Sequence, residues 1–180
     1  EDVDTVFFTH LHPDHVGWNL AQGGAGIRPT FPSARYVAHQ ADWDAWKRPE
    51  VQKVFPYPFW EETCGPLEGL GVLDLVSGEQ ALTSEITAFE TPGHTPGSMS
   101  LAIVSGGERA FILGDVLHGP AQVTETEWVF HFDTDQALAI QTRIRMIDRA
   151  EAENAAIVAC HHARFGRVVR ADGRRYWQGW

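Results

Sequence analysis

Cysteine is scarce in this chain, which has two such residues, Cys64 and Cys160, among 180. Their wide separation fits neither a disulfide framework nor the paired thiolates of a structural zinc site. No apolar run approaches the ~18 residues that a membrane-spanning helix needs. We therefore expect a protein of a reducing compartment, the cytoplasm, with no membrane partner.

Positive charge is also in short supply, because 14 lysines and arginines stand against 24 aspartates and glutamates, for a net charge of −10. A chain this acidic repels phosphate backbones and anionic lipid surfaces, so nucleic acid is not expected as a partner. A local positive site would have to come from bound cations. The nine histidines are not counted in that charge.

The length and composition are ordinary for one globular domain, with 180 residues of which 43% are hydrophobic. We expect a single domain over residues 1–180. The chain begins with Glu1 rather than methionine and reaches a strand-like segment within a few residues, so we expect this domain to be N-terminally incomplete. An export signal ahead of Glu1 would not be visible. The sequence has no marker of oligomeric state.

Short apolar segments bounded by glycine, proline and polar residues predict strands. The predicted strands are Asp4–Thr9, Ala34–His39, Gly71–Val76, Ile86–Thr91, Ser98–Val104, Glu108–Leu113 and Ala156–Cys160. Between them, the glycine-rich segment Asn19–Pro32 predicts a loop, and the proline-rich segment Pro49–Leu67 predicts an irregular connection. We see no internal repeat.

Two segments predict helices, Ala41–Arg48 and the longer Thr134–Glu153. The residues of the longer segment that recur at spacings of three and four, and so predict its buried face, are Ala137, Ile140, Ile144 and Ile147. Asp133 is expected to cap its N-terminus. Arg143 and Arg145 are expected on the surface or edge of this helix.

Side chains that bind metals follow four of the predicted strands. His10 comes after the first strand, His94 and Asp115 each follow a later strand through a glycine-containing turn, and His161 follows the last one. Strand ends that meet at one edge of a layered sheet are where such folds usually place their sites. We therefore expect these four side chains to converge in one pocket.

The segment HLHPDH, residues 10–15, holds three histidines and one aspartate in six positions. His10 and His12 could point to one side of an extended turn, whereas Asp14 and His15 reach a second point. Imidazole nitrogens and carboxylate oxygens suit Zn²⁺ and related metals, and a catalytic site keeps one position for water. Four adjacent ligands are too many for one such site. Two metals that share a bridging carboxylate would use them all, and Asp115 is the natural candidate for the bridge.

Other histidines and aromatic residues have plainer interpretations. His39, His118 and His131 are expected to be structural, hydrogen-bonded histidines. Cys160 is expected to pack at the end of its strand and not to act as a nucleophile. Most of the aromatic residues outside the strands are expected in the core, although some could line an apolar pocket. These aromatic residues are Trp18, Trp43, Trp46, Phe55, Phe59, Trp60 and Trp128.

Small residues surround the later candidate ligands. Gly93, Gly97 and Gly114 are expected to permit tight turns that need a positive φ, with an ordinary strand turn as the alternative for Gly97. Thr91 and Thr95 are expected to hydrogen-bond imidazoles and to hold each in one tautomer beside a metal. The sequence therefore predicts supporting residues as well as ligands.

Four segments together resemble a known family, the metallo-β-lactamase-fold hydrolases. They are THLHPDHVG (Thr9–Gly17), TPGHTPGS (Thr91–Ser98), GDVLHGPAQ (Gly114–Gln122) and ACHHARFGRV (Ala159–Val168), in family order. GWN after the histidine motif, ARYVAHQADWDAW and GDVLHGPAQ are most similar to the branch with N-acyl homoserine lactone lactonases and methyl parathion hydrolase. The resemblance implies an α/β fold, the αββα sandwich. Part of the N-terminal β-layer is expected to be missing, because the family places a strand-rich segment ahead of the first motif.

The resemblance also implies two divalent metal ions, with zinc expected and manganese, iron or cobalt as alternatives. By that resemblance the ligands are His10, His12 and His94 for one ion, Asp14, His15 and His161 for the other, and Asp115 as the bridge. His162 is an alternative to its neighbour His161. Asp14 and Asp115 are also the candidates for assisting proton movement.

These expectations point to a dinuclear metal-dependent hydrolase. A metal-bridging hydroxide would attack an ester-like bond of a small molecule, such as a lactone, a carboxylic ester or a phosphotriester. A thioester hydrolase of the same fold is one alternative, whereas a di-iron redox protein is disfavoured because that type carries a glutamate at the place of His12. A metal-binding, catalytically impaired fragment is the other alternative, because a missing β-layer would loosen the site.

Overall fold

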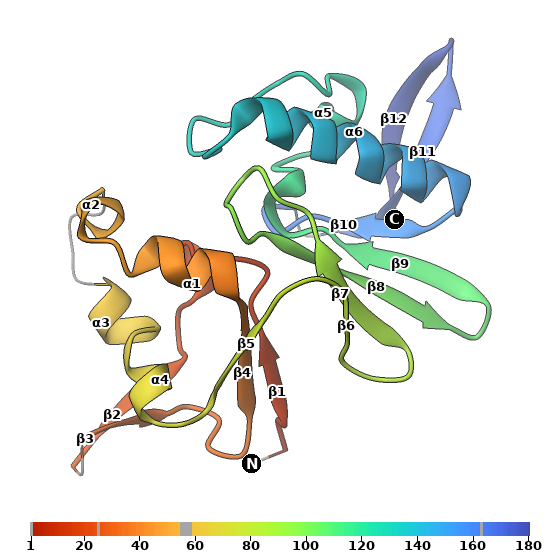
Figure 1. Ribbon diagram of the computed structural model, residues 1–180. Coiled ribbons are helices and arrows are strands. Elements are labelled where there is room, and N and C mark those ends of the chain that lie inside the picture. Colours follow the sequence, from red (N-terminus) through yellow and green to blue (C-terminus); the bar gives the residue numbers. More distant parts are fainter. Residues whose placement is uncertain (1, 25, 55–58, 163) are drawn as a thin grey trace. The chain divides into compact units, whose positions relative to one another are not determined.

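The computed structural model describes residues 2–24, 26–54, 59–162 and 164–180, and Figure 1 shows their course. The chain divides into two compact units, residues 1–77 and residues 78–180. Every sheet lies within one unit, so each unit has its own framework. Within the described ranges, no helix has both the length and the apolar character needed to cross a bilayer.

The first unit is built on a parallel sheet of three strands in the order β1–β4–β5. The bounds are Thr5–Phe7 for β1, Arg35–His39 for β4 and Leu73–Val76 for β5. The central strand is buried from Tyr36 to His39, as expected for a parallel strand that is covered on both faces. The predicted strands that begin at Asp4, Ala34 and Gly71 are therefore confirmed, each shorter than predicted.

Short helices lie between β4 and β5 in the first unit. They are α1 (Gln40–Trp46), α2 (Pro49–Gln52), α3 (Phe59–Thr63) and α4 (Pro66–Gly69). His39 caps α1, because its Nδ1 accepts a hydrogen bond from the backbone N–H of Ala41 at 3.0 Å. The structural role predicted for His39 is thereby confirmed. Proline begins α2 and α4, at the helix position where its missing N–H costs least.

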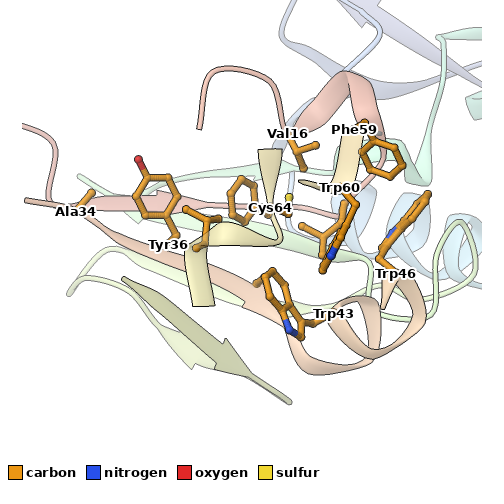
Figure 2. Packing of buried hydrophobic residues seen from close by; sticks show 12 residues of the cluster. Val16, Ala34, Tyr36, Trp43, Trp46, Phe59, Trp60 and Cys64 are labelled. Carbon is orange, nitrogen blue, oxygen red and sulfur yellow. The ribbon is translucent and has the colours of Figure 1, made fainter. Parts of the chain in front are cut away.

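Aromatic side chains fill the core of the first unit, as Figure 2 shows. The ring centroids of Trp43 and Trp60 are 4.7 Å apart, and Trp46 meets Phe59 edge-on at 5.0 Å. Tyr36 enters from β4, and its hydroxyl accepts a hydrogen bond from the backbone N–H of Phe31 at 3.1 Å. Four of the predicted core aromatics are thus buried together.

The remaining aromatics of that prediction behave differently. Trp18 is 89% exposed and Trp128 is 59% exposed, so neither belongs to the aromatic residues that pack in the core. Phe55 lies outside the described residues. An exposed tryptophan costs little by itself, because much of any folded surface is apolar.

The second unit is built on a sheet of seven strands in the order β12–β11–β10–β9–β8–β7–β6. The bounds are Gln80–Ala81 for β6, Ile86–Glu90 for β7, Met99–Ser105 for β8, Glu108–Ile112 for β9, Ala156–Val158 for β10, Gly166–Ala171 for β11 and Arg174–Gly179 for β12. Neighbouring strands are antiparallel except β9 and β10, which are parallel. The long helix α6 (Gln136–Ala152) packs on this sheet through Met146 and Ile147, which share a core cluster with Phe111.

The buried face of α6 differs from the predicted one. Ile147 is buried, but Ala137 and Ile144 are exposed and Ile140 is half-buried. The prediction was wrong because it considered apolar residues alone, whereas the buried stripe includes Thr142 and Arg143. The residues on this stripe are Ala139, Thr142, Arg143, Met146, Ile147 and Ala150.

Both segments predicted to be irregular contain regular elements, so those predictions were wrong. A hairpin of β2 (Leu20–Gly23) and β3 (Gly26–Pro29) occupies the predicted loop. The proline-rich connection contains α2 and α3 and the start of α4. The β11–β12 hairpin was not predicted either, because arginines interrupt its apolar alternation.

Candidate metal centre

The histidine segment of the first unit follows β1 directly and contains one turn of 3-10 helix, η1 (Pro13–His15). The ring centroids of His10 and His12 are 4.8 Å apart, and those of His10 and His15 are 4.1 Å apart. Asp14 Oδ2 lies 3.3 Å from His15 Nε2. The predicted cluster of nitrogen and oxygen ligands is therefore compact, as its sequence spacing suggested.

A buried carboxylate outside the motif anchors this segment. The backbone N–H of Leu11, between His10 and His12, donates a hydrogen bond to Asp42 Oδ2 at 3.1 Å. Asp42 is 1% exposed and lies in the first turn of α1, and the Leu11 side chain is completely buried. The middle of the motif is thus fixed from both its backbone and its side chain. Sequence reasoning did not find this role of Asp42, because nothing local distinguishes it from an ordinary acidic residue in a first helical turn.

The sheet of the second unit brings three predicted ligands to one edge. Strands β7, β9 and β10 run in the same direction, because β8 is antiparallel to both β7 and β9 while β9 and β10 are parallel. Ile112 of β9 pairs with Val158 of β10, and Asp115 and His161 each come three residues later. His94 follows the end of β7 at the same edge. The convergence predicted for these residues from strand ends is observed within this unit.

Three imidazole nitrogens surround one oxygen of Asp115 in the turn η2 (Gly114–Val116). Asp115 Oδ2 lies 3.3 Å from His94 Nε2, 3.2 Å from His118 Nε2 and 3.1 Å from His161 Nε2. Asp115 and His94 are 5% and 2% exposed. Buried nitrogen and carboxylate donors that converge in this way suit a divalent metal such as Zn²⁺, whose bonds to nitrogen and oxygen are ~2.0–2.2 Å long. The residues present therefore fit the metal that the sequence implies.

Asp133 fixes the orientation of His94. His94 Nδ1 is 2.9 Å from Asp133 Oδ1, and the other carboxylate oxygen accepts the backbone N–H of Phe130 at 2.9 Å. Because Nδ1 donates to the carboxylate, Nε2 presents its lone pair on the side of Asp115. Burial by itself would raise the pKa of Asp133, but the hydrogen bonds from His94 and Phe130 outweigh it and lower this pKa.

Asp133 was predicted to be the cap of α6, and that prediction was wrong. The cap is Asp135, whose side chain accepts a hydrogen bond from the backbone N–H of Leu138 at 2.9 Å. The sequence offers two aspartates two positions apart, and helical pattern alone does not separate them. The hydroxyls of Thr91 and Thr95, which were expected to hold imidazoles, lie 2.9 Å from Ser100 Oγ and 2.7 Å from Ser98 Oγ, respectively, and their role toward imidazoles stays a prediction.

Two of the three glycines, Gly93 and Gly114, hold the positive φ predicted for them, whereas Gly97 takes the alternative of an ordinary turn. Gly93 has a φ of +133° and Gly114 a φ of +56°. A Cβ atom on Gly93 would lie 2.4 Å from the backbone nitrogen of Ala139 in α6. Two backbone hydrogen bonds add to this close approach, from Thr134 to the His94 carbonyl at 3.0 Å and from Asp135 to the Gly93 carbonyl at 3.0 Å. The start of α6 and the His94 turn are therefore joined through their backbones.

The residues near His161 separate the two alternatives for the last ligand. His161 lies beside Asp115, whereas the ring of His162 contacts Trp177 at a centroid distance of 4.2 Å. This geometry favours His161. Cys160 is exposed, so the expectation that it packs at the strand end was wrong. It follows β10 but lies past its last paired residue, Val158.

His118 and His131 were grouped with the structural histidines. His131 is exposed. His118 is different, since it stands 3.2 Å from Asp115 and its ring stacks on Phe130 at a centroid distance of 4.1 Å. Its position three residues after Asp115, on the same turn, was the available sequence signal.

A model of the Metallo-beta-lactamase superfamily matches residues 1–161. The chain belongs to this superfamily. YobT of Bacillus subtilis (strain 168), which is described as an uncharacterized protein, is 27% identical over 183 residues, or 94% of this chain and 70% of YobT. The resemblance that the sequence motifs indicated is thus confirmed.

Solved structures show the same fold. The hydrolase AbOPH of the beta lactamase superfamily gives a TM-score of 0.83 at 25% identity and covers 99% of this chain and 64% of its own. AidC, a dizinc quorum-quenching lactonase in complex with the product N-hexanoyl-L-homoserine, gives a TM-score of 0.78 at 22% identity, with coverage of 98% and 64%. This chain thus spans 64% of the length of either solved chain. The predicted metallo-β-lactamase fold is confirmed.

Proposed function

We propose that this chain carries the site of a dinuclear metal-dependent hydrolase that cleaves an ester-like bond of a small molecule. Lactones, carboxylic esters and phosphotriesters are the substrate classes. The proposed ligands are His10, His12 and His94 for one ion, Asp14, His15 and His161 for the other, and Asp115 as the bridge. Zinc is the expected metal, with manganese, iron and cobalt as alternatives.

The observation that carries this proposal is the group of histidine nitrogens around the carboxylate of Asp115. One of its carboxylate oxygens has histidine nitrogens at 3.1, 3.2 and 3.3 Å. Neutral imidazole nitrogens and a carboxylate oxygen both offer lone pairs, so their convergence suits a divalent cation shared among them. Within the first unit, the histidine segment holds three imidazoles and the Asp14 carboxylate close together, and such donors suit a divalent ion.

When bound, the ions would lower the pKa of water to supply a nucleophile near neutral pH and would polarise the bond under attack. The chain's own residues orient this chemistry. Asp133 holds His94 in one tautomer, and Asp42 holds the backbone of the histidine motif. Asp14, whose side chain is 59% exposed, can exchange protons with solvent, whereas that of Asp115 is 3% exposed. We therefore assign the transfer of protons to Asp14 in preference to Asp115.

The test combines metal analysis with a substrate panel. Purified protein is analysed for bound metal and then assayed on N-acyl homoserine lactones, aryl esters, a phosphotriester and a thioester, with and without chelator. We expect two equivalents of metal and chelator-sensitive turnover of at least one oxygen ester. Asp115→Asn should lose both metal and turnover, while Asp172→Asn, in the distant β11–β12 turn, should lose neither. Full turnover by metal-free protein would contradict the proposal.

A metal-binding, catalytically impaired fragment is the alternative, and the coverage of 64% of the solved hydrolase chain is the observation that favours it. In this case the protein binds metal but turns over no member of the panel, also when it is expressed with any sequence that precedes Glu1. Turnover of the thioester alone would instead indicate a thioester hydrolase of the same fold.

A further inference from the structure

Arg143 is a charged side chain buried completely on α6, with 0% exposure. Burying a guanidinium group is costly unless its donors are paired and its charge is offset. Arg143 is outside the proposed ligand set, and sequence pattern placed it on the surface. Its burial therefore requires a role for which a smaller or apolar residue would not serve.

The hydrogen bonds of Arg143 reach two separate segments of the second unit. Its Nε donates to the carbonyl of Val116 at 3.0 Å, and Val116 is the residue directly after Asp115. Its Nη1 donates to the carbonyls of Thr126 and Trp128 at 2.8 and 2.6 Å. A planar, forked donor suits this task, since one group binds three carbonyls at fixed angles.

The remaining nitrogen of Arg143 lies near the residue that orients His94. Nη2 is 3.9 Å from Asp133 Oδ2, and both side chains are completely buried. Asp133 binds His94 through its other oxygen. The positive charge of Arg143 thus stands opposite the carboxylate that holds a proposed ligand, at a depth where water screens the interaction little.

We propose that Arg143 is a positioning residue for the candidate metal centre, because one guanidinium group joins the turn that carries Asp115 to the segment that leads to Asp133, the residue that orients His94. The bridging carboxylate and the oriented imidazole then keep a fixed spacing before metal arrives. This inference rests on the proposed function, since it concerns the same site. Arg143 is not one of the proposed ligands, and it acts through Val116 and Asp133.

The test compares zinc affinity among three variants. Arg143→Met removes the charge and all donors but keeps the apolar stem, and Arg143→Lys keeps the charge without the forked geometry. Arg145→Met is the matched control, because Arg145 is exposed two residues further along the same helix. Each apoprotein is checked for its fold by circular dichroism, and zinc is titrated in competition with a chromophoric chelator. The absorption spectrum of the Co²⁺-loaded protein reports the ligand geometry.

We expect Arg143→Met to weaken zinc binding by about 10- to 100-fold, as is typical when a residue that supports metal ligands is removed. Arg143→Lys should fall between that variant and the unaltered protein, and Arg145→Met should stay within about twofold. The Co²⁺ spectrum should change for the Arg143 variants alone. A merely structural role would lower the unfolding midpoint while the folded variants bind zinc normally, and that result would overturn the proposal.

Arg143→Lys keeps the test decisive if Arg143→Met does not fold. Zinc affinity within twofold of the unaltered protein in folded Arg143→Lys overturns the proposal, and a clear loss supports it. The readout also separates this inference from the hydrolase proposal. Zinc binding without turnover by the unaltered protein contradicts the hydrolase alone, whereas turnover with normal zinc affinity in the Arg143 variants contradicts the positioning role alone.

Discussion

At the scale of single residues, the second unit shows how a carboxylate outside the proposed ligand set can fix the orientation of a proposed ligand. Asp133 is 7% exposed and receives hydrogen bonds from His94 and from a backbone amide. It selects the nitrogen of His94 that faces Asp115. Such partners are as necessary to a metal site as the ligands themselves.

Asp133→Asn tests this selection. The amide can present an N–H where the carboxylate accepted one, so His94 should lose its fixed tautomer, and zinc affinity should fall by about 10- to 100-fold. Chelator competition measures the change. Asp148→Asn, on the exposed side of α6, serves as the control. Equal affinity in Asp133→Asn and the unaltered protein would show that His94 is oriented by something else.

The two cysteines should differ sharply in reactivity. Burial raises the pKa of the Cys64 thiol to about 12, whereas Cys160 is exposed. Since the thiolate is the reactive form, Cys64 should be protonated and inert at pH 8. We expect one rapid equivalent of thiol reagent in native protein and two after unfolding, with Cys160→Ser leaving no rapid equivalent. Two rapid equivalents in the native state would contradict the burial of Cys64.

What could be predicted at residue scale depended on local signals. The ligand candidates stood out because histidine and aspartate are rare after apolar strands. Asp42, Asp133 and Arg143 did not, because each acts on a segment distant in sequence. Their roles come from tertiary contacts, which no spacing rule encodes.

At the scale of elements, the decisive contact of the second unit is between the His94 turn and α6. A Cβ atom at position 93 would lie 2.4 Å from a backbone nitrogen of the helix. Backbone atoms cannot move aside as side chains do, so the helix itself would have to shift. The geometry of His94 therefore depends on the absence of a single methyl group.

Gly93→Ala should destabilise the protein by roughly 3 kcal/mol or more, because an unfavourable φ adds to a backbone clash. Gly106→Ala is the matched control, since Gly106 also has a positive φ, of +58°, but a Cβ atom there would meet nothing within 4 Å. That variant should lose only about 1–2 kcal/mol. Denaturant unfolding measures both, and equal losses would argue against the close approach.

The elements themselves were predicted where a short, mainly apolar segment is bounded by glycine, proline or polar residues, as for β1, β4, β7, β8, β9 and β10. Prediction failed where the pattern is mixed. The β11–β12 hairpin alternates arginines with valine and aromatic residues, and α6 buries a threonine and an arginine on its packed stripe. In both places polar side chains find partners through tertiary contacts, so the distribution of apolar residues alone does not predict the strands or the buried face of the helix.

At the scale of the whole molecule, family membership was available from four short motifs, and the match over residues 1–161 confirms it. Motifs succeed here because the metal chemistry restricts residue types and their order more tightly than packing restricts the rest of the chain. The expectation of a single domain over residues 1–180 and the assignment of each ligand stay predictions.

Metal removal should have a global effect if the proposed ligand set is right. A ligand that binds only the folded state adds about 2.7 kcal/mol of stability at a concentration 100 times its dissociation constant. We expect zinc to raise the midpoint of thermal unfolding and a chelator to lower it, while Asp115→Asn should show no response to either. Differential scanning calorimetry at fixed protein concentration measures this. An identical midpoint with and without zinc would contradict metal binding to the native state.

The pairing of Ile112 with Val158 has a consequence for how this sequence can change over time. The positions of Asp115 and His161 depend on their distance of three residues from that pair. Deleting one residue within β9 or β10 would therefore turn the following side chain to the opposite face of the sheet. Extra residues at the Asp172–Gly173 bend, at the far end of the β11–β12 hairpin, would leave that distance unchanged. Among related sequences, insertions and deletions should therefore be common at that bend and rare in β9 and β10.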